Sequence, residues 1–332
     1  SLKLIEVQMQ KAIILRDYGN SDVLKIEQVS VDDPKKGELL IKHTAIGVHF
    51  HDVYVRSGLY KTLKLPGIPG IEATGIVEKV GDGILDFNIG DRVGYISSEY
   101  GAYSTHRTLD KNLAVKIPDY ISDQLIATNF SRAITVQMLI EQVTQLKANH
   151  TILVTAASGG VGRILCQWAN VIGASVIGTV SSTEKVKLAK SYGCKYAFTY
   201  NQKDLIPKIM DITNGKGLDK VYDSVGLDTF ETSIHILRKC GHLINFGQSS
   251  GPVKPLQMST LANKSLTVSR PILFHYISQS DIYKRMTDSV FNAFKNKSII
   301  IPEPFPFNLE DASLAHDVLE SRSGGGSLYL KP

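Results

Sequence analysis

Long hydrophobic runs and cysteine are scarce in this chain of 332 residues, and each shortage excludes a class of protein. No apolar stretch reaches the roughly 20 residues that a membrane-spanning helix needs. The three cysteines, Cys166, Cys194 and Cys240, form no CxxC pair, and no secretory signal is recognisable. We therefore expect buried thiols of a reducing compartment, and hence a cytoplasmic protein without disulfides.

The excess of positive over negative charge is small as well. The formal net charge of +5 is mild and no basic run concentrates it, so nucleic acid is not indicated; an anionic cofactor is sufficient reason for the excess. The chain is long enough for one large or two ordinary domains with their own cores. Met9 resembles a natural start, which makes residues 1–8 either an added remnant or an extension.

Short strand patterns separated by Gly, Pro, Asp and Asn fill the N-terminal third and predict a twisted or barrel-like β domain. Strands are expected at 12–15, 24–29, 38–46, 75–80 and 91–96. From about residue 122 the character changes, with helices expected at 122–127 and 134–145.

Strands then alternate with helices from 151 to about 268, which predicts a parallel, doubly wound sheet. The later strands are expected at 196–200, 220–224, 242–246 and 266–268, followed by a helix at 280–296 and a last strand at 326–330.

Residues 151–185 carry the strongest functional signal. An apolar run at 152–154 meets a turn of small residues at 156–162, an amphipathic helix follows, and a second strand at 175–180 completes a β–turn–α–β unit. Small residues let the backbone approach a pyrophosphate, whose charge is stabilised by amide N–H groups at the helix N-terminus. The unit therefore predicts a dinucleotide site.

The ribose end of this site indicates which dinucleotide binds. A site for NAD usually has Asp or Glu at the end of the second strand, whereas this chain has Ser181 and Ser182 there, with Lys185 one turn later. Hydroxyls and a cation suit a 2′-phosphate, so NADPH is predicted over NADH. The alternative is that Ser182 only caps the following helix and Lys185 is a solvated charge.

The chain contains, in this order, the segments GVHFHDVYVRSGLY (47–60), PGIEATGIVEKVGDG (69–83), GDRVGY (90–95), GAYSTH (101–106), AASGGVG (156–162), VYDSVG (221–226), NFGQSSG (245–251), SRPILFHY (269–276) and ESRSGGGSLYL (320–330). Together these segments resemble the zinc-free quinone oxidoreductase branch of the medium-chain dehydrogenase/reductase superfamily. In the glycine turn, Ala156, Gly159 and Gly162 occupy the positions of the AxxGxxG variant typical of that branch.

The resemblance implies an α/β fold in which a Rossmann domain at 133–269 accompanies a GroES-like catalytic domain at 9–132 and 270–332. It implies an active cleft between the two domains and, by analogy, a homodimer.

The same resemblance implies residues for the cofactor. Those expected along the pyrophosphate are Gly159, Gly160 and Val161, and those expected around the adenosine and 2′-phosphate are Ser182, Lys185, Tyr200 and Arg322. Those expected near the nicotinamide half are Phe246, Gly247, Gln248, Ser249, Leu273 and Phe274. As alternatives, Tyr200 only terminates a strand and Arg322 is a surface cation.

Zinc-dependent relatives hold catalytic zinc where this chain has His49, Ile71, Glu72 and Ser131. Although His49 and Glu72 are possible ligands, tetrahedral catalytic zinc requires three from the protein, so no metal is expected. The protein is then expected to supply orientation and hydrogen bonds, with His49, Tyr54, Tyr60 and Thr135 as catalytic candidates. The branch usually has Asn where this chain has His49, which is either a proton donor or a tolerated polar replacement.

Three functions are consistent with these observations. The first is NADPH-dependent reduction of quinones, with Phe50, Tyr54 and Tyr60 lining the cleft. The second is reduction of enones or alkenals at an activated double bond. The third is an NADPH-binding protein with an RNA-binding or structural role, which the mild charge and the absence of an aromatic–basic motif disfavour.

Overall fold

The computed structural model describes residues 10–321 and 326–332 and divides into two compact units. Unit 1 consists of the described residues up to Ser131 and from Ile301 onward, and unit 2 consists of Arg132–Ile300. Residues 1–8 and Arg322, both of which figure in the sequence predictions, lie outside the described residues. Among those described, no helix is long and apolar enough to cross a bilayer.

Unit 1 is built on a seven-stranded sheet. Six strands follow the order β14-β15-β3-β4-β5-β7, while β6 pairs with β3, and a separate ribbon is formed by β1 and β2. The strands are β1 (Lys11–Ile14), β2 (Lys25–Gln28), β3 (Glu38–Val48), β4 (Glu72–Val80), β5 (Arg92–Ile96), β6 (His106–Asp110), β7 (Val115–Lys116), β14 (Phe305–Asn308) and β15 (Leu328–Lys331).

The C-terminal strand β15 pairs antiparallel with β3, with Leu328 opposite Val48. Its residues Leu328 and Leu330 join the core that β3 and β4 form, because alternate side chains of a strand face the same side. Strand β15 thus lies in unit 1, together with β3. Helices α1 (Phe50–Ser57) and α10 (Ala312–Ser321) also belong to this unit.

Unit 2 contains a six-stranded parallel sheet in the order β10-β9-β8-β11-β12-β13, which is the doubly wound dinucleotide-binding order. Its strands are β8 (Thr151–Val154), β9 (Ser175–Val180), β10 (Tyr196–Thr199), β11 (Leu218–Asp223), β12 (Leu237–Asn245) and β13 (Thr267–Ser269). The predicted parallel sheet is confirmed.

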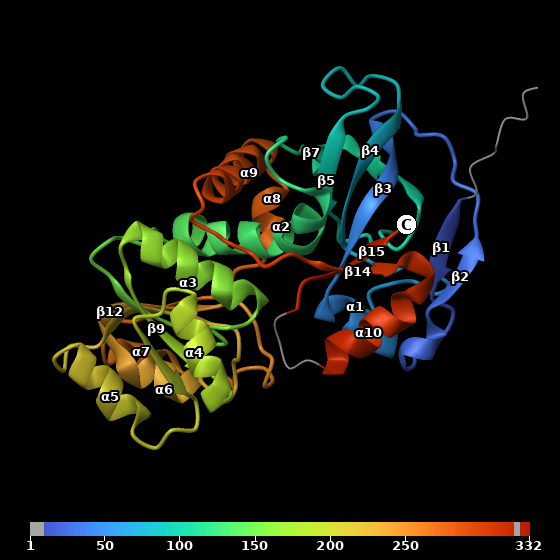
Figure 1. Cartoon of the computed structure of the whole chain (residues 1–332). Coiled ribbons are helices and arrows are strands. Elements are labelled where there is room, and N and C mark those ends of the chain that lie inside the picture. The colour runs from blue at the N-terminus through green and yellow to red at the C-terminus, as the bar shows by residue number, and fades with distance from the viewer. Residues whose placement is uncertain (1–9, 322–325) are drawn as a thin grey trace, which may run out of the picture. The chain divides into compact units, whose positions relative to one another are not determined.

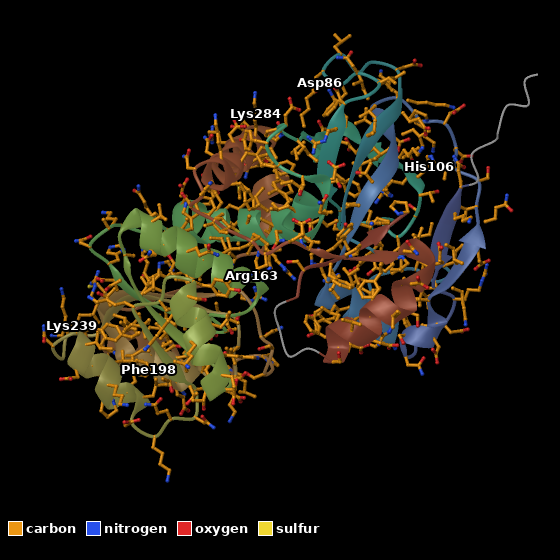
Figure 2. The ribbon with its side chains drawn as sticks, viewed as in Figure 1. Asp86, His106, Arg163, Phe198, Lys239 and Lys284 are labelled. Carbon is orange, nitrogen blue, oxygen red and sulfur yellow. The ribbon has the colours of Figure 1, made fainter. Side chains whose placement is uncertain are left out.

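The helices that follow β8 in this unit are α3 (Gly160–Ile172), α4 (Thr183–Ser191), α5 (Leu205–Ile212), α6 (Phe230–Ile236), α7 (Met258–Ala262), α8 (Leu273–Ile277) and α9 (Ser280–Lys295), all of which are labelled in Figure 1. Helices α3 and α4 contact β9, whereas α5 and α6 contact each other over a core that includes Leu205, Ile209 and Ile236. Phe198 of β10, labelled in Figure 2, packs against the same core.

Two local expectations differ from the structure. The two helices expected around residue 130 are one helix, α2 (Asp123–Gln137), continued by a π-helical turn, Met138–Val143. Apolar periodicity fails there because a polar residue, Thr128, is buried. Its hydroxyl donates a hydrogen bond to the carbonyl of Gln124 in the same helix. Cys240, expected to be buried, is exposed within β12, where its φ is +60°.

The second domain boundary also differs from the sequence expectation. Residues 270–300, expected in the catalytic domain, are grouped with unit 2. Strand β13 pairs with β12 at the sheet edge, and the segment after it ends at Ile300, whose N–H and carbonyl both hydrogen-bond to Gln167 of α3 at 2.9 and 3.2 Å. These contacts hold α8 and α9 with the Rossmann sheet.

We expect Leu330→Ala to lower the free energy of unfolding by about 2–5 kcal/mol, because it leaves a cavity where a fully buried leucine anchors β15. Urea denaturation measures the loss. Leu314→Ala is the matched control, since Leu314 is 53% exposed on α10 and its truncation should cost less than about 0.5 kcal/mol. Equal losses in the two variants would contradict the role assigned to β15.

Candidate functional site

In the glycine turn of unit 2, residues 156–162, backbone atoms from the start and the end of the turn lie close together. A Cβ placed on Gly162 would collide with the carbonyl oxygen of Ala156 and lie 2.9 Å from the Cα of Ala157. Ala156 itself has a φ of +48°, which turns the chain from β8 into α3. Gly159 is the N-cap of α3, and Gly160 and Val161 form its first turn.

This arrangement fits a pyrophosphate, because the first N–H groups of a helix have no partner within the helix. Sequence reasoning missed a cation beside it. Arg132 covers Gly160 so closely that a Cβ there would lie 2.7 Å from the guanidinium carbon. Its position within a separate helix, α2, left no local signal.

Tyr200 follows β10 and does more than terminate a strand. Its hydroxyl oxygen accepts a hydrogen bond of 2.8 Å from the backbone N–H of Ala156. Burial raises the pKa of Tyr200, so the hydroxyl stays protonated. The structure thus brings two predicted cofactor residues from separate strands together.

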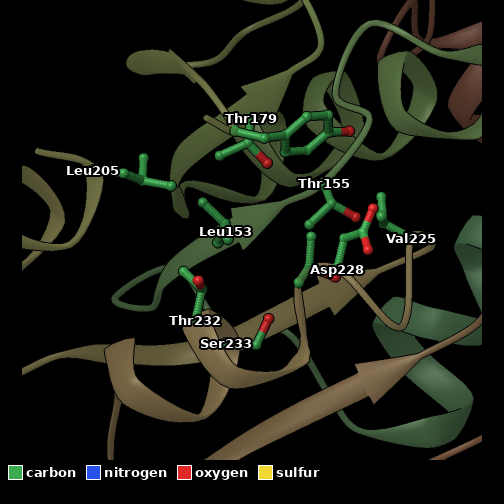
Figure 3. Close-up of a pocket in the computed structure, with 10 residues that line it drawn as sticks. Leu153, Thr155, Thr179, Leu205, Val225, Asp228, Thr232 and Ser233 are labelled. Carbon is green, nitrogen blue, oxygen red and sulfur yellow. The ribbon is translucent and has the colours of Figure 1, made fainter. Parts of the chain in front are cut away.

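A cavity of about 170 Å³ opens at the carboxyl ends of the central strands (Figure 3). It is lined by Leu153, Thr155, Thr179, Tyr200, Leu205, Val225, Asp228, Thr229, Thr232 and Ser233. This edge is where open α/β sheets bind ligands. Except for Tyr200, sequence reasoning missed these residues; the signal that could have found Thr155 and Thr179 is their position at strand ends.

The predicted 2′-phosphate residues lie at the start of α4. The ammonium of Lys185 is 3.1 Å from the hydroxyl of Ser181, and both groups are accessible. Ser182 occupies the N-cap position, but its side chain makes no capping hydrogen bond. The alternative function of Ser182 as a helix cap therefore has no hydrogen bond to support it.

The loop that follows β12 is joined to the loop after β11. The N–H of Phe246 donates to the carbonyl of Asp223 at 2.8 Å, and the N–H of Ser249 donates to that of Ser224 at 3.1 Å. Gly247 and Gln248 lie between these two bonds. Leu273 and Phe274 begin α8, where Phe274 is exposed.

In unit 1, His49 ends β3 and caps α1, with its ring against a buried carboxylate. Its Nε2 lies 2.6 Å from Oε1 of Glu72, which also accepts a 3.0 Å hydrogen bond from the hydroxyl of Ser131. The side chain of Glu72 is fully buried, so these donors replace its lost hydration. His49 is thus bonded through Nε2 rather than left as an unpaired donor.

These residues do not fit catalytic zinc. The hydroxyl of Ser131 and the side chain of Ile71 stand where zinc-dependent relatives place ligands, and no thiol is among them. Across residues 10–321 and 326–332, no group of three His, Cys, Asp or Glu side chains is arranged to hold a metal. The donor set supplies fewer than the three ligands that tetrahedral zinc needs.

Asp52 begins a buried chain of hydrogen bonds behind His49. Its Oδ2 accepts from the N–H of His49 at 2.8 Å and from the hydroxyl of Tyr103 at 3.1 Å, whereas its Oδ1 has no partner in the described structure. Burial raises the pKa of Asp52 to about 6, because desolvation disfavours the charged carboxylate.

This series of hydrogen bonds continues through His316 to Arg56 of α1. Nε2 of His316 is 2.9 Å from the hydroxyl of Tyr103, and Nδ1 is 3.0 Å from Nη1 of Arg56. Burial lowers the pKa of His316 to about 3, so the ring is neutral. Arg56 can only donate, which leaves the proton of His316 on Nε2, directed at Tyr103. Arg56 also forms two hydrogen bonds of 3.0 and 3.1 Å with Glu320.

Tyr54 and Tyr60 form an aromatic surface beside this network. Their rings meet edge to face with centroids 5.3 Å apart, and Phe50 lies 6.4 Å from Tyr54. Tyr60 is 41% exposed, so its ring is accessible to a ligand. Thr135, the remaining catalytic candidate, lies on α2 within unit 2, in a different unit from these rings.

Two family models match the chain. The model described as the alcohol dehydrogenase GroES-like domain matches residues 35–119, and the one described as zinc-binding dehydrogenase matches residues 160–292. The first match falls within unit 1 and the second within unit 2. Together they define a dehydrogenase of the medium-chain class.

Individual relatives indicate the branch of this class to which the chain is similar in sequence. Quinone oxidoreductase 1 of Escherichia coli (strain K12) is 37% identical over 98% of this chain and 100% of its own length. A 2-haloacrylate reductase from a Burkholderia species is 34% identical over 98% of this chain and 99% of its own. The crystal structure of E. coli quinone oxidoreductase complexed with NADPH has a TM-score of 0.89 at 37% identity and covers 97% of this chain and 100% of that chain.

The chain therefore belongs to the quinone oxidoreductase branch of the medium-chain dehydrogenase/reductase superfamily. The family and the fold class predicted from its motifs are confirmed.

We expect Gly162→Ala to lower the free energy of unfolding by about 1–3 kcal/mol, because the added methyl group forces the turn apart. Gly159→Ala is the matched control in the same turn: a Cβ there would lie 3.2 Å from the Ala156 carbonyl oxygen and needs only a small adjustment. Urea denaturation compares the two variants. A loss at Gly159 as large as that at Gly162 would contradict the close approach described for Gly162.

We expect Asp52→Asn to change how stability depends on pH. Because the folded pKa of about 6 exceeds the unfolded value of about 3.9, the carboxyl group contributes most stability below pH 4 and loses it as the pH rises through 6. The variant should therefore gain on the order of 3 kcal/mol relative to wild type between pH 4 and pH 7. If the substituted amide group lacks hydrogen-bond partners, this lowers the free energy of unfolding of the variant by an amount that does not vary with pH.

Urea denaturation at pH 4, 5, 6 and 7 measures this difference for Asp52→Asn. Exposed Asp17, changed to Asn, is the control and should leave the slope unchanged. A difference between wild type and Asp52→Asn that is constant over this range would show that the buried carboxyl titrates normally.

Proposed function

We propose that this protein is an NADPH-dependent quinone reductase that works without zinc. The observation that carries the proposal is the accessible aromatic surface of Tyr54 and Tyr60, of which Tyr54 lies on α1, the helix that His49 caps. His49 and Glu72 contact each other in a donor set that does not fit zinc. Planar acceptors bind to such surfaces by stacking and edge contacts. The E. coli relative, by name, acts on the same class of compound.

The cofactor proposal rests on unit 2. When bound, NADPH supplies the hydride, and the residues of this chain bind and orient it. The turn at Ala156–Gly162 would hold the pyrophosphate, and the 170 Å³ cavity would hold the adenosine. Lys185 and Ser181 would bind the 2′-phosphate through a charge-assisted hydrogen bond and a hydroxyl contact. The E. coli structure named as a complex with NADPH supports this choice.

On the acceptor side, the ring of His49 is held by Glu72, and its backbone N–H is held by Asp52, the first member of the buried series of hydrogen bonds. We propose that His49 orients the acceptor, while Tyr54 and Tyr60 contact its ring. Thr135 is proposed near the nicotinamide from the family resemblance. The roles of Phe246–Ser249, Leu273 and Phe274 at the nicotinamide half are proposed on the same ground.

A second acceptor class is an activated carbon–carbon double bond. The observation that favours it is the Burkholderia relative, a 2-haloacrylate reductase that is 34% identical over almost the whole chain. Steady-state rates with NADPH and a panel of 1,4-quinones, enals and haloacrylates discriminate the two classes. A higher kcat/KM for the alkenes than for every quinone would reject quinone reduction as the main activity.

We also propose a cytoplasmic homodimer. The cytoplasmic location is supported by three free cysteines, and the dimer by the family resemblance. Analytical ultracentrifugation tests the dimer, and a monomer at micromolar concentration would reject it.

We expect Lys185→Ala to weaken NADPH binding about tenfold, because a hydrogen bond to a charged group contributes about 1.5–3 kcal/mol. NADH binding should change little, since NADH lacks the 2′-phosphate. Lys187→Ala, on the same helix, is the matched control and should affect neither cofactor. Fluorescence titration measures both affinities. Equal weakening for NADPH and NADH would show that Lys185 does not contact the 2′-phosphate.

A further inference from the structure

His51 and Tyr100 form a junction beside the aromatic surface, and neither figures among the predicted site residues. Nε2 of His51 lies 3.0 Å from the hydroxyl of Tyr100, and the two rings stack with centroids 5.8 Å apart and an interplanar angle of 28°. His51 also contacts Tyr60: the two rings meet edge to face, with their centroids 5.4 Å apart. His51 therefore joins a buried tyrosine to an exposed one.

The hydroxyl of Tyr100 connects three segments of unit 1. Besides His51 of α1, it makes a short hydrogen bond with the hydroxyl of Thr62, two residues beyond Tyr60. Tyr100 is only 5% exposed, whereas His51 is half-buried and Thr62 is exposed, so both bonds are partly buried. One buried hydroxyl thus fixes α1, the loop that carries Tyr60, and the loop that carries Tyr100.

The backbone at Tyr100 is held in an uncommon conformation. Its φ of +61° lies in the left-handed region, which costs a non-glycine residue on the order of 1–3 kcal/mol. The conformation is maintained on both sides: the guanidinium of Arg107 donates to the carbonyl of Tyr100, and the N–H of Gly101 donates to the carbonyl of Ile68 at 2.9 Å. The surrounding contacts therefore specify where the Tyr100 ring lies.

Both rings are uncharged near neutral pH. Burial lowers the pKa of His51, and the charge of His49 acts in the same direction; burial also raises the pKa of Tyr100. A neutral imidazole beside Tyr60 adds apolar, polarisable surface without a charge that an acceptor would have to desolvate.

We propose that His51 and Tyr100 are positioning residues that fix Tyr60 for the binding of a planar, fused-ring quinone. The proposal deepens the quinone reductase function and depends on it. Rings of Tyr54, Tyr60 and His51 follow one another at centroid separations of 5.3 and 5.4 Å. A two-ring acceptor contacts more of Tyr60 and Tyr54 than a single-ring acceptor does, so its binding depends more strongly on the position of Tyr60, which His51 holds.

The test compares Tyr100→Phe and His51→Leu with wild type, using NADPH with 1,4-naphthoquinone and with 1,4-benzoquinone. Tyr100→Phe removes only the hydroxyl. In both variants the KM for naphthoquinone should rise about fivefold, the size expected for one net hydrogen bond, with kcat and the KM for NADPH unchanged. The KM for benzoquinone should rise distinctly less.

Two further variants control for a structural effect. His51→Gln retains a side chain that can hydrogen-bond to Tyr100 and should recover most of the affinity lost in His51→Leu. Tyr18→Phe removes a hydroxyl from an exposed tyrosine of the same unit and should leave both KM values at the wild-type level. Thermal melts of all variants accompany the kinetics.

The proposal is overturned if Tyr100→Phe and His51→Leu lower the melting temperature while the ratio of the two KM values stays at that of wild type. A wild-type protein that reduces no quinone would instead reject the proposed function. Anaerobic calorimetry with 1,4-naphthohydroquinone then decides the inference separately: binding about fivefold weaker in Tyr100→Phe supports it, and unchanged binding rejects it.

Discussion

The buried carboxylate of Asp52 is the constraint on which the acceptor half of the molecule depends. It accepts from the N–H of His49 and from the hydroxyl of Tyr103, and the chain of bonds then runs through His316 to Arg56. Because unpaired buried polar groups are costly, each member of this chain holds its neighbour in one orientation. Helix α1 and helix α10 are thereby joined through buried side chains.

The candidate side chains in unit 1 depend on that junction. Helix α1 begins at Phe50, directly after His49, and carries His51 and Tyr54 on successive turns, so fixing its N-terminus also fixes their rings. His49 is additionally held by Glu72 from β4. A rigid helix start thus converts a short stretch of sequence into a defined aromatic surface beside a buried histidine–carboxylate pair.

A second backbone constraint controls unit 2. Close approach at Gly162 lets α3 begin immediately after β8, which places helix N–H groups at the carboxyl edge of the sheet. The hydroxyl of Tyr200 and the cavity around Thr155 lie at the same edge, because parallel strands end together there. The features proposed to hold the cofactor therefore follow from strand order, whereas those proposed to hold the acceptor depend on side-chain contacts between residues distant in sequence.

The sequence by itself determined the class of fold and the glycine turn, and it predicts the cationic ribose end, because these depend on local spacing: small residues between a strand and a helix, and Lys185 one turn after Ser181. Only the tertiary structure decided what depends on residues distant in sequence. Asp52 meets His316 through Tyr103, His49 meets Glu72, and His51 meets Tyr100. Helix α1 escaped notice because Asp52 and Arg56 face inward, contrary to the apolar periodicity that identifies helices. Long-range hydrogen bonds pair groups whose separation in sequence carries no period, so no local pattern could have revealed them.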